Sequence, residues 1–456
     1  MTGGTAASFR DPAGFVFRRE GTLYRQIDAS YREHYDHLMA SGLHEALATR
    51  GWLVRHEEVE SHLAAAPGAY RVIRPEPVPI VSYPFEWSFG QLRDAALLTL
   101  DIMREALAHG MILRDGTAFN VQFRGSRPVF IDTLSFGRYR DGQPWYGYRQ
   151  FCEFFLAPLA LMARRDVRLG GLLRRFPNGL PLDMAASLLD LGSRMRLGLL
   201  LHIHLHARAQ RKYADAAATP RRVERTTLER MVEHLRQVVE GLRWEPVGTA
   251  WADYEETHGY SESAVGTKQR LVADFLAQVR PRTVWDLGAN TGVFSRVAAE
   301  QGARVVAIEG DPGAAERHYR RLRGAADERI LPLLVDLLDP TPRTGWASEE
   351  RLSLADRGPA DAVLALALIH HLTLGGNVPL ARVAEFFGRI GRVLIVEWVP
   401  PDDPQARRLV MHRPEAPLAY TREAFDAAFD ARFETIASAA VEESGRVLFL
   451  MRRRDA

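Results

Sequence analysis

Three acidic residues in the second half of the chain each stand at the end of a short apolar run. Asp286 ends "TVWD", Glu309 ends "RVVAIE" and Asp336 ends "LPLLVD". Runs of this kind are typical of buried parallel strands, whose carboxyl ends bind ligands. A carboxylate there can accept hydrogen bonds from ribose hydroxyls, as we expect of Glu309, or from an adenine amino group, as we expect of Asp336.

The segment after Asp286, "LGANTG", contains two glycines that permit a tight turn and a close approach of the backbone to a ligand. A dinucleotide-binding fingerprint would place glycine at positions 288, 290 and 293. Asn290 and Val293 occupy two of these positions. The loop therefore indicates ligand binding, but it is a poor cradle for a pyrophosphate.

His370 and His371 directly follow a fourth apolar run, "VLALALI". An imidazole titrates near neutral pH and can take a proton from a reacting group. We expect His371 to be the more exposed and to act as a base or orienting group, with His370 packed inward. The alternative is a purely structural role in packing or capping. A histidine base predicts an acidic limb near neutral pH in the rate profile.

Two further charged residues stand out in this half of the chain. Glu397 lies in a fifth apolar run, "VLIVEWV", where a buried carboxylate needs an oppositely charged partner or a task in binding. The sequence leaves structural ion pairing and acceptor binding both open. Lys268 is one of only two lysines, with Lys212. Because an ammonium differs from a guanidinium in geometry and hydration, Lys268 is a candidate binding residue.

The elements that position these side chains alternate between strand and helix from residue 268 onward. We expect strands at 283–288, 304–309, 330–336, 361–368, 392–399, 433–440 and 446–452. We expect helices at 268–279, 293–302, 312–325, 379–391 and 421–432. This alternation predicts a parallel α/β sheet. The last two strands are consecutive and joined by "EESG", so they should form an antiparallel hairpin.

A resemblance to a known family accompanies these patterns. The segments "VWDLGANTGVFS", "VVAIEGD", "LLVDLLD", "DAVLALALIHHL" and "VLIVEWV" resemble, in this order, the motifs of class I S-adenosylmethionine-dependent methyltransferases. The resemblance covers about residues 250–456. It implies a Rossmann-like, seven-stranded sheet with a C-terminal antiparallel hairpin, and S-adenosyl-L-methionine as cofactor.

The resemblance also implies roles for individual residues. The implied cofactor site consists of Asp286, Gly288, Asn290, Gly292, Glu309, Gly310, Asp336, Leu337, Tyr260 and Lys268. In it, Asp286 lies beside the methionine part, Glu309 takes the ribose diol and Asp336 takes the adenine. The segment "ADYEETHGYSESAVGTKQRLV" resembles the cofactor lid of the family, in which Tyr254 and His258 would contact substrate. His371, His370 and Glu397 are the catalytic candidates.

The N-terminal half contains a second informative stretch, "ILRDGTAFNVQFRGSRPVFIDTLSF". Asp115, Asn120 and Asp132 have a spacing that resembles the catalytic loop and metal-binding aspartate of protein-kinase-like phosphotransferases. No lysine precedes position 212, and a glycine-rich loop is missing. Arg25 would be a poor substitute for the phosphate-binding lysine. A degenerate kinase-like α+β domain, an active kinase and coincidence all remain open.

Bulk properties limit the class of protein. The chain has 456 residues, 46% of them hydrophobic and 25% charged, with a net charge of +2 and one cysteine. Such a chain is globular, fits a reducing compartment and makes a dedicated nucleic-acid binder unlikely, although the arginine-rich 207–243 region leaves RNA open. Neither a membrane span nor a signal peptide is expected, which indicates a cytoplasmic protein. The alternate histidines of "HIHLH" fall in a helical context, so no metal site is expected.

The sequence predicts three segments: an N-terminal α+β domain over 1–215, a helical linker over 216–250 and a methyltransferase domain over 251–456. The leading interpretation is methyl transfer to a small-molecule, natural-product or glycan acceptor by in-line displacement. The N-terminal half would form or carry the acceptor site. The alternatives are a bifunctional kinase-like methyltransferase and a non-catalytic, cofactor-binding scaffold.

Overall fold

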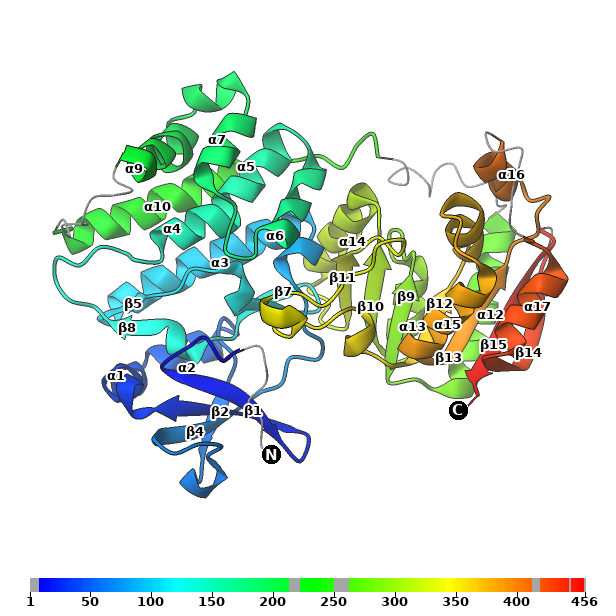
Figure 1. Cartoon of the computed structure of the whole chain (residues 1–456), viewed down its shortest axis with the longest axis horizontal. Coiled ribbons are helices and arrows are strands. Elements are labelled where there is room, and N and C mark those ends of the chain that lie inside the picture. The colour runs from blue at the N-terminus through cyan, green and yellow to red at the C-terminus, as the bar shows by residue number, and fades with distance from the viewer. Residues whose placement is uncertain (1–7, 213–221, 250–261, 412–418, 443, 455–456) are drawn as a thin grey trace. The chain divides into compact units, whose positions relative to one another are not determined.

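The computed structural model describes residues 8–212, 222–249, 262–411, 419–442 and 444–454. The chain divides into two compact units (Figure 1). The N-terminal unit consists of Met1–Glu245 together with Thr344–Arg351, and the C-terminal unit consists of Pro246–Arg343 and Leu352–Ala456. No helix within the described ranges is long and apolar enough to cross a membrane.

The C-terminal unit is built on one seven-stranded sheet. Its strands are β9 (Thr283–Leu287), β10 (Arg304–Glu309), β11 (Ile330–Leu334), β12 (Ala360–Ala365), β13 (Gly391–Trp398), β14 (Phe433–Val441) and β15 (Arg446–Arg453). Their order is β11-β10-β9-β12-β13-β15-β14. The first five strands in sequence are parallel, and β15 is antiparallel to both β13 and β14. The predicted parallel sheet with a final antiparallel hairpin is confirmed.

The helices of this unit are α12 (Glu262–Val279), α13 (Val293–Glu300), α14 (Pro312–Ala325), α15 (Leu380–Ile390), α16 (Pro404–Val410) and α17 (Arg422–Asp430). Local sequence explains their starts. Asp311 accepts hydrogen bonds from the backbone N–H groups of Gly313 and Ala314, and Pro312 occupies the first turn of α14. Thr421 caps α17 in the same way. All five predicted helices are present, although α12 begins earlier than expected.

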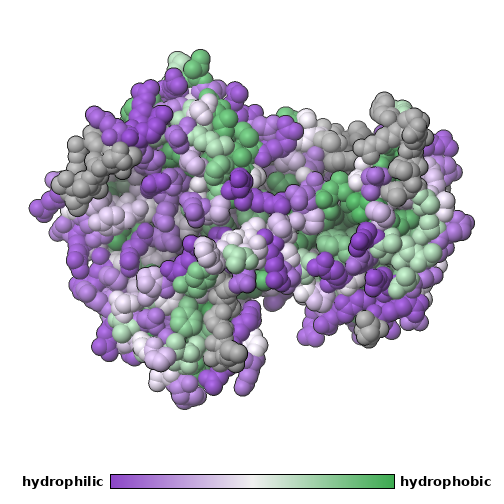
Figure 2. Space-filling view, in the orientation of Figure 1, coloured by the Kyte–Doolittle hydropathy of each residue, from purple (hydrophilic) through white to green (hydrophobic). Residues whose placement is uncertain are grey.

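The core of the C-terminal unit lies between the sheet and its helices. Val284, Ala362, Ile395 and Leu450 come from four different strands, and each is fully buried. They face apolar residues of α12 and α13, among them Val272. Hydrophilic residues dominate much of the face of the molecule seen in Figure 2. Burial of the apolar side chains between the sheet and its helices fixes the strand register, and thereby the position of every strand end.

The N-terminal unit begins with a four-stranded antiparallel sheet. Its strands are β1 (Gly14–Arg19), β2 (Thr22–Asp28), β3 (His56–Val59) and β4 (Ala69–Pro75), in the order β1-β2-β4-β3. Helices α1 (Arg32–Ala40) and α2 (Leu43–Thr49) connect β2 to β3. Two small ladders follow, β5 (Met111–Leu113) with β8 (Phe136–Arg138) and β6 (Val121–Arg124) with β7 (Arg127–Phe130).

The rest of the N-terminal unit is mainly helical. Its helices are α3 (Phe89–Ala108), α4 (Tyr148–Phe151), α5 (Ala157–Arg164), α6 (Leu172–Arg175), α7 (Leu182–Leu188), α8 (Leu197–Leu199), α9 (His206–Lys212) and α10 (Arg225–Gly241). Ser88 and Gln91 form a capping box at the start of α3. Gly110, with φ of 69°, follows the other end of α3, where a glycine easily takes this conformation.

The helix expected in a linker over 216–250 belongs instead to the N-terminal unit. Helix α10 packs along α3 and buries Leu228, Val232, Leu235 and Val239. Its Arg236 lies 3.2 Å from the Asp101 carboxylate of α3. The charged residues of this segment lie mainly on the exposed face of α10, whereas its apolar residues are buried.

The segment Thr344–Arg351 also belongs to the N-terminal unit, although it lies between β11 and β12 in the sequence. Glu350 forms an ion pair with Arg10. The Arg351 guanidinium lies 4.0 Å from the centre of the Phe119 ring, a cation–π contact. No sequence pattern indicated this exchange, because the segment is short and has no regular periodicity.

Candidate functional site

A cavity of about 560 Å³ lies in the C-terminal unit, at the carboxyl ends of the parallel strands. The loops after β9, β10, β11 and β12 all contribute to it, as the strand order requires. It is lined by Val265, Lys268, Asp286, Gly288, Ala289, Asn290, Thr291, Val293, Phe294, Glu309, Gly310, Asp311, Pro312, Val335, Asp336, Leu337, Leu338, Leu366, Ala367, Leu368, His371, Leu372 and Gly375. The three strand-end acids therefore share one cavity.

Asp286 lies near the end of β9 and is almost completely buried. Its carboxylate accepts a hydrogen bond of 2.6 Å from the Ser295 hydroxyl, on α13. Burial raises the pKa of Asp286 to about 6, because the ionised form loses its hydration. A carboxylate in this condition favours a ligand that supplies positive charge.

The loop after β9 turns through residues with positive φ. Gly288 has φ of 70° and Asn290 has φ of 49°, a conformation that asparagine tolerates better than most residues. The N–H groups of Gly288 and Ala289 donate to the Ile308 carbonyl at 2.8 and 3.0 Å, which ties the loop to β10. This geometry brings backbone against the cavity without side chains in between.

Gly292 also has a positive φ, 85°, but it does not line the cavity. A Cβ atom at this position would lie 2.0 Å from Nε2 of His318, on α14. Close packing against the buried His318 ring therefore accounts for the glycine. We expected Gly292 beside the ligand, whereas it allows helices α13 and α14 to approach.

Glu309 is the last residue of β10, and its carboxylate binds the loop after β9 and the loop after β10. One carboxylate oxygen accepts from the Asn290 N–H at 2.7 Å, and the other accepts from the Asp311 N–H at 2.8 Å. The Gly310 N–H also donates to this carboxylate, which offers about four acceptor positions, so part of its acceptor capacity is left for a ligand. Burial raises the pKa of Glu309 to about 7. Backbone N–H groups thus hold the Glu309 carboxylate in place at the cavity.

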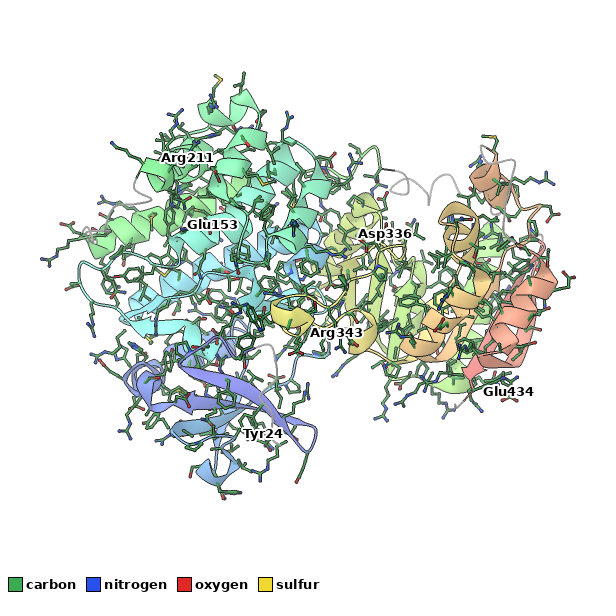
Figure 3. The ribbon with its side chains drawn as sticks, in the orientation of Figure 1. Tyr24, Glu153, Arg211, Asp336, Arg343 and Glu434 are labelled. Carbon is green, nitrogen blue, oxygen red and sulfur yellow. The ribbon has the colours of Figure 1, made fainter. Side chains whose placement is uncertain are left out.

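Asp336 lies two residues beyond β11, which ends at Leu334 rather than at 336 as predicted. Its side chain is exposed and accepts a hydrogen bond of 2.9 Å from the Leu338 N–H. Figure 3 labels Asp336 where the chain leaves β11. A Cβ atom on Gly310 would lie 3.6 Å from Cα of Asp336, so the loops after β10 and β11 lie close together. Leu337 and Gly310 line the cavity beside it.

Lys268, on α12, lines the cavity. Its partner Glu397 is not among the residues that line the cavity. The Lys268 ammonium donates a hydrogen bond of 2.6 Å to Oε2 of Glu397. The other Glu397 oxygen lies 3.5 Å from the Arg446 guanidinium, which also donates to Asp403 at 2.8 Å. Glu397 is fully buried, and structural ion pairing accounts for its charge.

His371 lines the cavity, whereas His370 is buried and does not. Their ring centres are 4.1 Å apart. Burial lowers the pKa of His371 to about 4 and that of His370 further still. The expected acidic limb near neutral pH therefore needs correction, because an imidazole with this pKa stays neutral throughout that range. His371 can still accept a proton or a hydrogen bond there.

The apolar wall of the cavity was not predicted residue by residue. Val265, Phe294, Leu366, Leu368 and Leu372 lie in loops and helix turns next to the polar residues. In the sequence they are apolar residues close to strand ends, and residues of the buried core have the same pattern, so the sequence alone does not distinguish the two. Tyr254, His258 and Tyr260 of the expected lid lie outside the residues that the structure describes.

A second group of predicted residues meets in the N-terminal unit. Asn120 donates to the Ser135 hydroxyl at 3.0 Å, and that hydroxyl donates to Asp132. Arg25, from β2, lies 2.5 Å from the Asp132 carboxylate. Asp115 lies close enough to Asp132 for the negative charge of Asp132 to contribute to a raised pKa, after burial. Asp132 is thus paired with a cation of the protein itself.

No model of a known protein family matches the chain. Among solved structures, the N-methyltransferase NodS from Bradyrhizobium japonicum WM9 is 11% identical, with 43% of this chain and 99% of NodS covered and a TM-score of 0.33. Magnesium protoporphyrin IX methyltransferase (ChlM) from Synechocystis PCC 6803, with bound SAH, is 14% identical, with 44% and 93% covered and a TM-score of 0.31.

The similarity to a curated protein extends over the whole length. The nodulation protein NoeA of Rhizobium meliloti (strain 1021) is 35% identical over an alignment of 464 positions. The alignment covers 99% of this chain and 97% of NoeA. The chain therefore belongs to the family of the nodulation protein NoeA.

Proposed function

We propose that this protein is an S-adenosylmethionine-dependent methyltransferase that acts on a small-molecule, natural-product or glycan acceptor. The observation that carries the proposal is the arrangement of Asp286, Glu309 and Asp336 around one cavity. Each carboxylate comes from the end of a different strand, and each suits a different part of the cofactor.

The residues fit the chemical groups of the cofactor in order along the sheet. Asp286, a buried acid whose pKa is raised by burial, would hold the cationic methionine part. Glu309, held by backbone N–H groups at the cavity, would receive the two ribose hydroxyls. Asp336, exposed at the far side, would accept from the adenine amino group. When bound, the cofactor supplies a methyl group activated by a positively charged sulfur.

The chain itself contributes alignment, exclusion of water and a proton acceptor. The apolar wall formed by Phe294, Leu366 and Leu368 would exclude water from the reacting groups. His371 lies on the wall and stays neutral at physiological pH, so it could accept the proton that an acceptor hydroxyl or amine loses. Lys268, held by Glu397, would fix the part of the wall that α12 provides.

Recognition of the acceptor is assigned to the N-terminal unit, since the sheet domain already accounts for the cofactor. We do not assign phosphate transfer to this unit. The Arg25–Asp132 pair supports that choice, because a guanidinium engages the carboxylate that would have to bind a metal ion. The kinase-like resemblance of residues 1–215 rests on the sequence pattern alone.

Two measurements test the proposal. Isothermal calorimetry with S-adenosylmethionine and S-adenosylhomocysteine should show binding of both, with one site per chain. Incubation with methyl-tritiated S-adenosylmethionine and an extract of cells that lack the gene should then label a low-molecular-weight or glycan fraction. Absence of cofactor binding would refute the proposal, whereas binding without any labelling would favour a cofactor-binding scaffold.

A further inference from the structure

A concentrated apolar surface lies on the helical part of the N-terminal unit, far along the chain from the cofactor cavity. Fifteen large apolar side chains are exposed in the described residues, and six of these lie between positions 188 and 205. The six are Leu188, Leu191, Met195, Leu197, Leu201 and Leu205; together they are called the leucine surface below. Scattered exposed apolar residues are ordinary, but a cluster of this size marks an interaction site.

The helical pattern shows that the exposure is built into the sequence. Residues 197–212 run continuously through α8, a π-helical stretch and α9. Leu197, Leu201 and Leu205 are spaced four residues apart and share its exposed side, where a solvated helix would carry polar residues. The opposite side is already filled by buried residues, among them Ile203 and Ala207. The leucines are therefore not needed for the core.

The residues before this helix are still more exposed. Leu191 is 77% exposed and Met195 is 90% exposed, at the two ends of the 3-10 helix Leu191–Met195 that connects α7 to α8. Exposure of large apolar side chains to water is unfavourable, and this unfavourable free energy is removed when the side chains enter an apolar environment.

The segment that carries the leucine surface is rich in positive charge. Between residues 188 and 212 there are five cations, Arg194, Arg196, Arg208, Arg211 and Lys212, and a single acid, Asp190. The acid is engaged by Arg164, in a bond of 3.0 Å between Nε and Oδ1. The four arginines of the segment make no ion pair with any acid in the part of the chain that the structure describes.

Two arginines of the segment that carries the leucine surface lie close to each other. The positive charges of Arg194 and Arg208 both contribute to lowering the pKa of His204, after burial, so the two guanidinium groups lie near one buried ring. Figure 2 shows hydrophobic and hydrophilic residues interleaved over the region of α7, and Figure 3 shows Arg211 extending from α9 nearby. Apolar groups flanked by long cationic side chains match the interface of a bilayer.

We propose that the leucine surface binds the face of a membrane that contains anionic phospholipids. Leu191, Met195 and Leu197 enter the headgroup region, and the arginines contact lipid phosphates. Charge favours this occupant over a second copy of the chain. A symmetric dimer would bring two cationic patches together, whereas an anionic bilayer neutralises them. This proposal does not depend on the cofactor site.

Vesicle co-sedimentation of the full-length protein tests the idea. One set of vesicles contains phosphatidylcholine alone, and the other contains equal parts of phosphatidylcholine and phosphatidylglycerol. The protein should sediment with the anionic vesicles, and added salt should weaken binding because it screens exposed charges. The double substitution Leu191→Asp with Met195→Asp should weaken binding by about tenfold or more, since it removes apolar contact and adds negative charge. Arg194→Gln with Arg196→Gln should weaken binding and reduce the salt dependence.

The matched control is Val247→Asp, at a side chain that is 70% exposed outside the leucine surface. It should bind anionic vesicles as the unmodified protein does. Equal binding to both kinds of vesicle, no binding to either, or an equal loss in the control would overturn the proposal. A different result would also overturn it. In that result, analytical ultracentrifugation shows a dimer of the unmodified protein that the Leu191→Asp/Met195→Asp protein does not form, and neither protein binds vesicles. That result would assign the surface to self-association.

Discussion

The ammonium of Lys268 lies 2.6 Å from Oε2 of Glu397, and the same oxygen accepts the Ala367 N–H at 2.6 Å. Lys268 and Ala367 both line the cavity, whereas Glu397 does not. One buried carboxylate therefore ties helix α12 to the loop after β12. Glu397, for which the sequence left structural ion pairing and acceptor binding open, thus positions two parts of the cavity wall.

Glu397→Gln should destabilise the C-terminal unit more than Lys268→Met. The first change removes the buried carboxylate that pairs with both Lys268 and Arg446, and a broken buried ion pair costs about 3–5 kcal/mol. The second leaves Glu397 with Arg446 and the Ala367 N–H. Thermal unfolding, with exposed Glu434→Gln as control, measures the order. Equal midpoints for all three variants would contradict it.

Glu309→Ala should weaken binding of S-adenosylmethionine by about tenfold or more, because two charge-assisted hydrogen bonds to the ribose are lost and water replaces them only in part. Calorimetry gives the dissociation constants directly. Glu434→Ala, an acid on β14 of the same unit that is labelled in Figure 3, is the matched control and should bind normally. Unchanged affinity in the Glu309 variant would remove the ribose assignment.

Cofactor affinity should fall as pH falls through the range from about 7 to about 6. Burial raises the pKa of Glu309 to about 7 and that of Asp286 to about 6 in the protein without ligand. A ligand that binds the ionised forms lowers both pKa values, so binding releases protons and is opposed by acid. Calorimetry near pH 7 in two buffers of different ionisation enthalpy measures the protons released.

Adenosine provides the control for this pH dependence. It has the ribose diol but no positive charge, so its affinity should follow the titration of Glu309 and not that of Asp286. Binding enthalpies that are independent of the buffer, together with a flat affinity across this range, would show that neither carboxylate meets the ligand.

His371→Ala should slow methyl transfer by about 10²–10⁴-fold and leave the cofactor dissociation constant unchanged. With its pKa lowered to about 4, His371 is protonated only in strong acid, so this residue should impose no limb on the rate profile near neutral pH. Label transfer in extract from the deletion strain supplies the rate. His62→Ala, at an exposed histidine, is the control. Full turnover in the His371 variant would leave the acceptor without a histidine base.

Periodicity predicted the sheet domain well because each of its strands is a short apolar run with one strong turn after it. The acids at the strand ends followed directly, since parallel strands bring their carboxyl ends to one edge. The role of Gly292 did not follow, because His318, the residue that excludes a side chain there, is 26 positions away and lies on another helix. The partners of Glu397 were hidden for the same reason: Lys268 and Arg446 are joined to it only by tertiary packing.

The placement of Thr344–Arg351 in the N-terminal unit has a consequence for synthesis of the protein. Chains grow from the N-terminus, and early domains generally fold before later ones are made. Here Glu350, the partner of Arg10, and Arg351, which covers Phe119, emerge about a hundred residues after Glu245. The first unit can acquire its final contacts only after β9, β10 and β11 of the other unit have left the ribosome. The order of folding is therefore interlocked, and a truncation at Glu245 yields a unit that lacks its last piece.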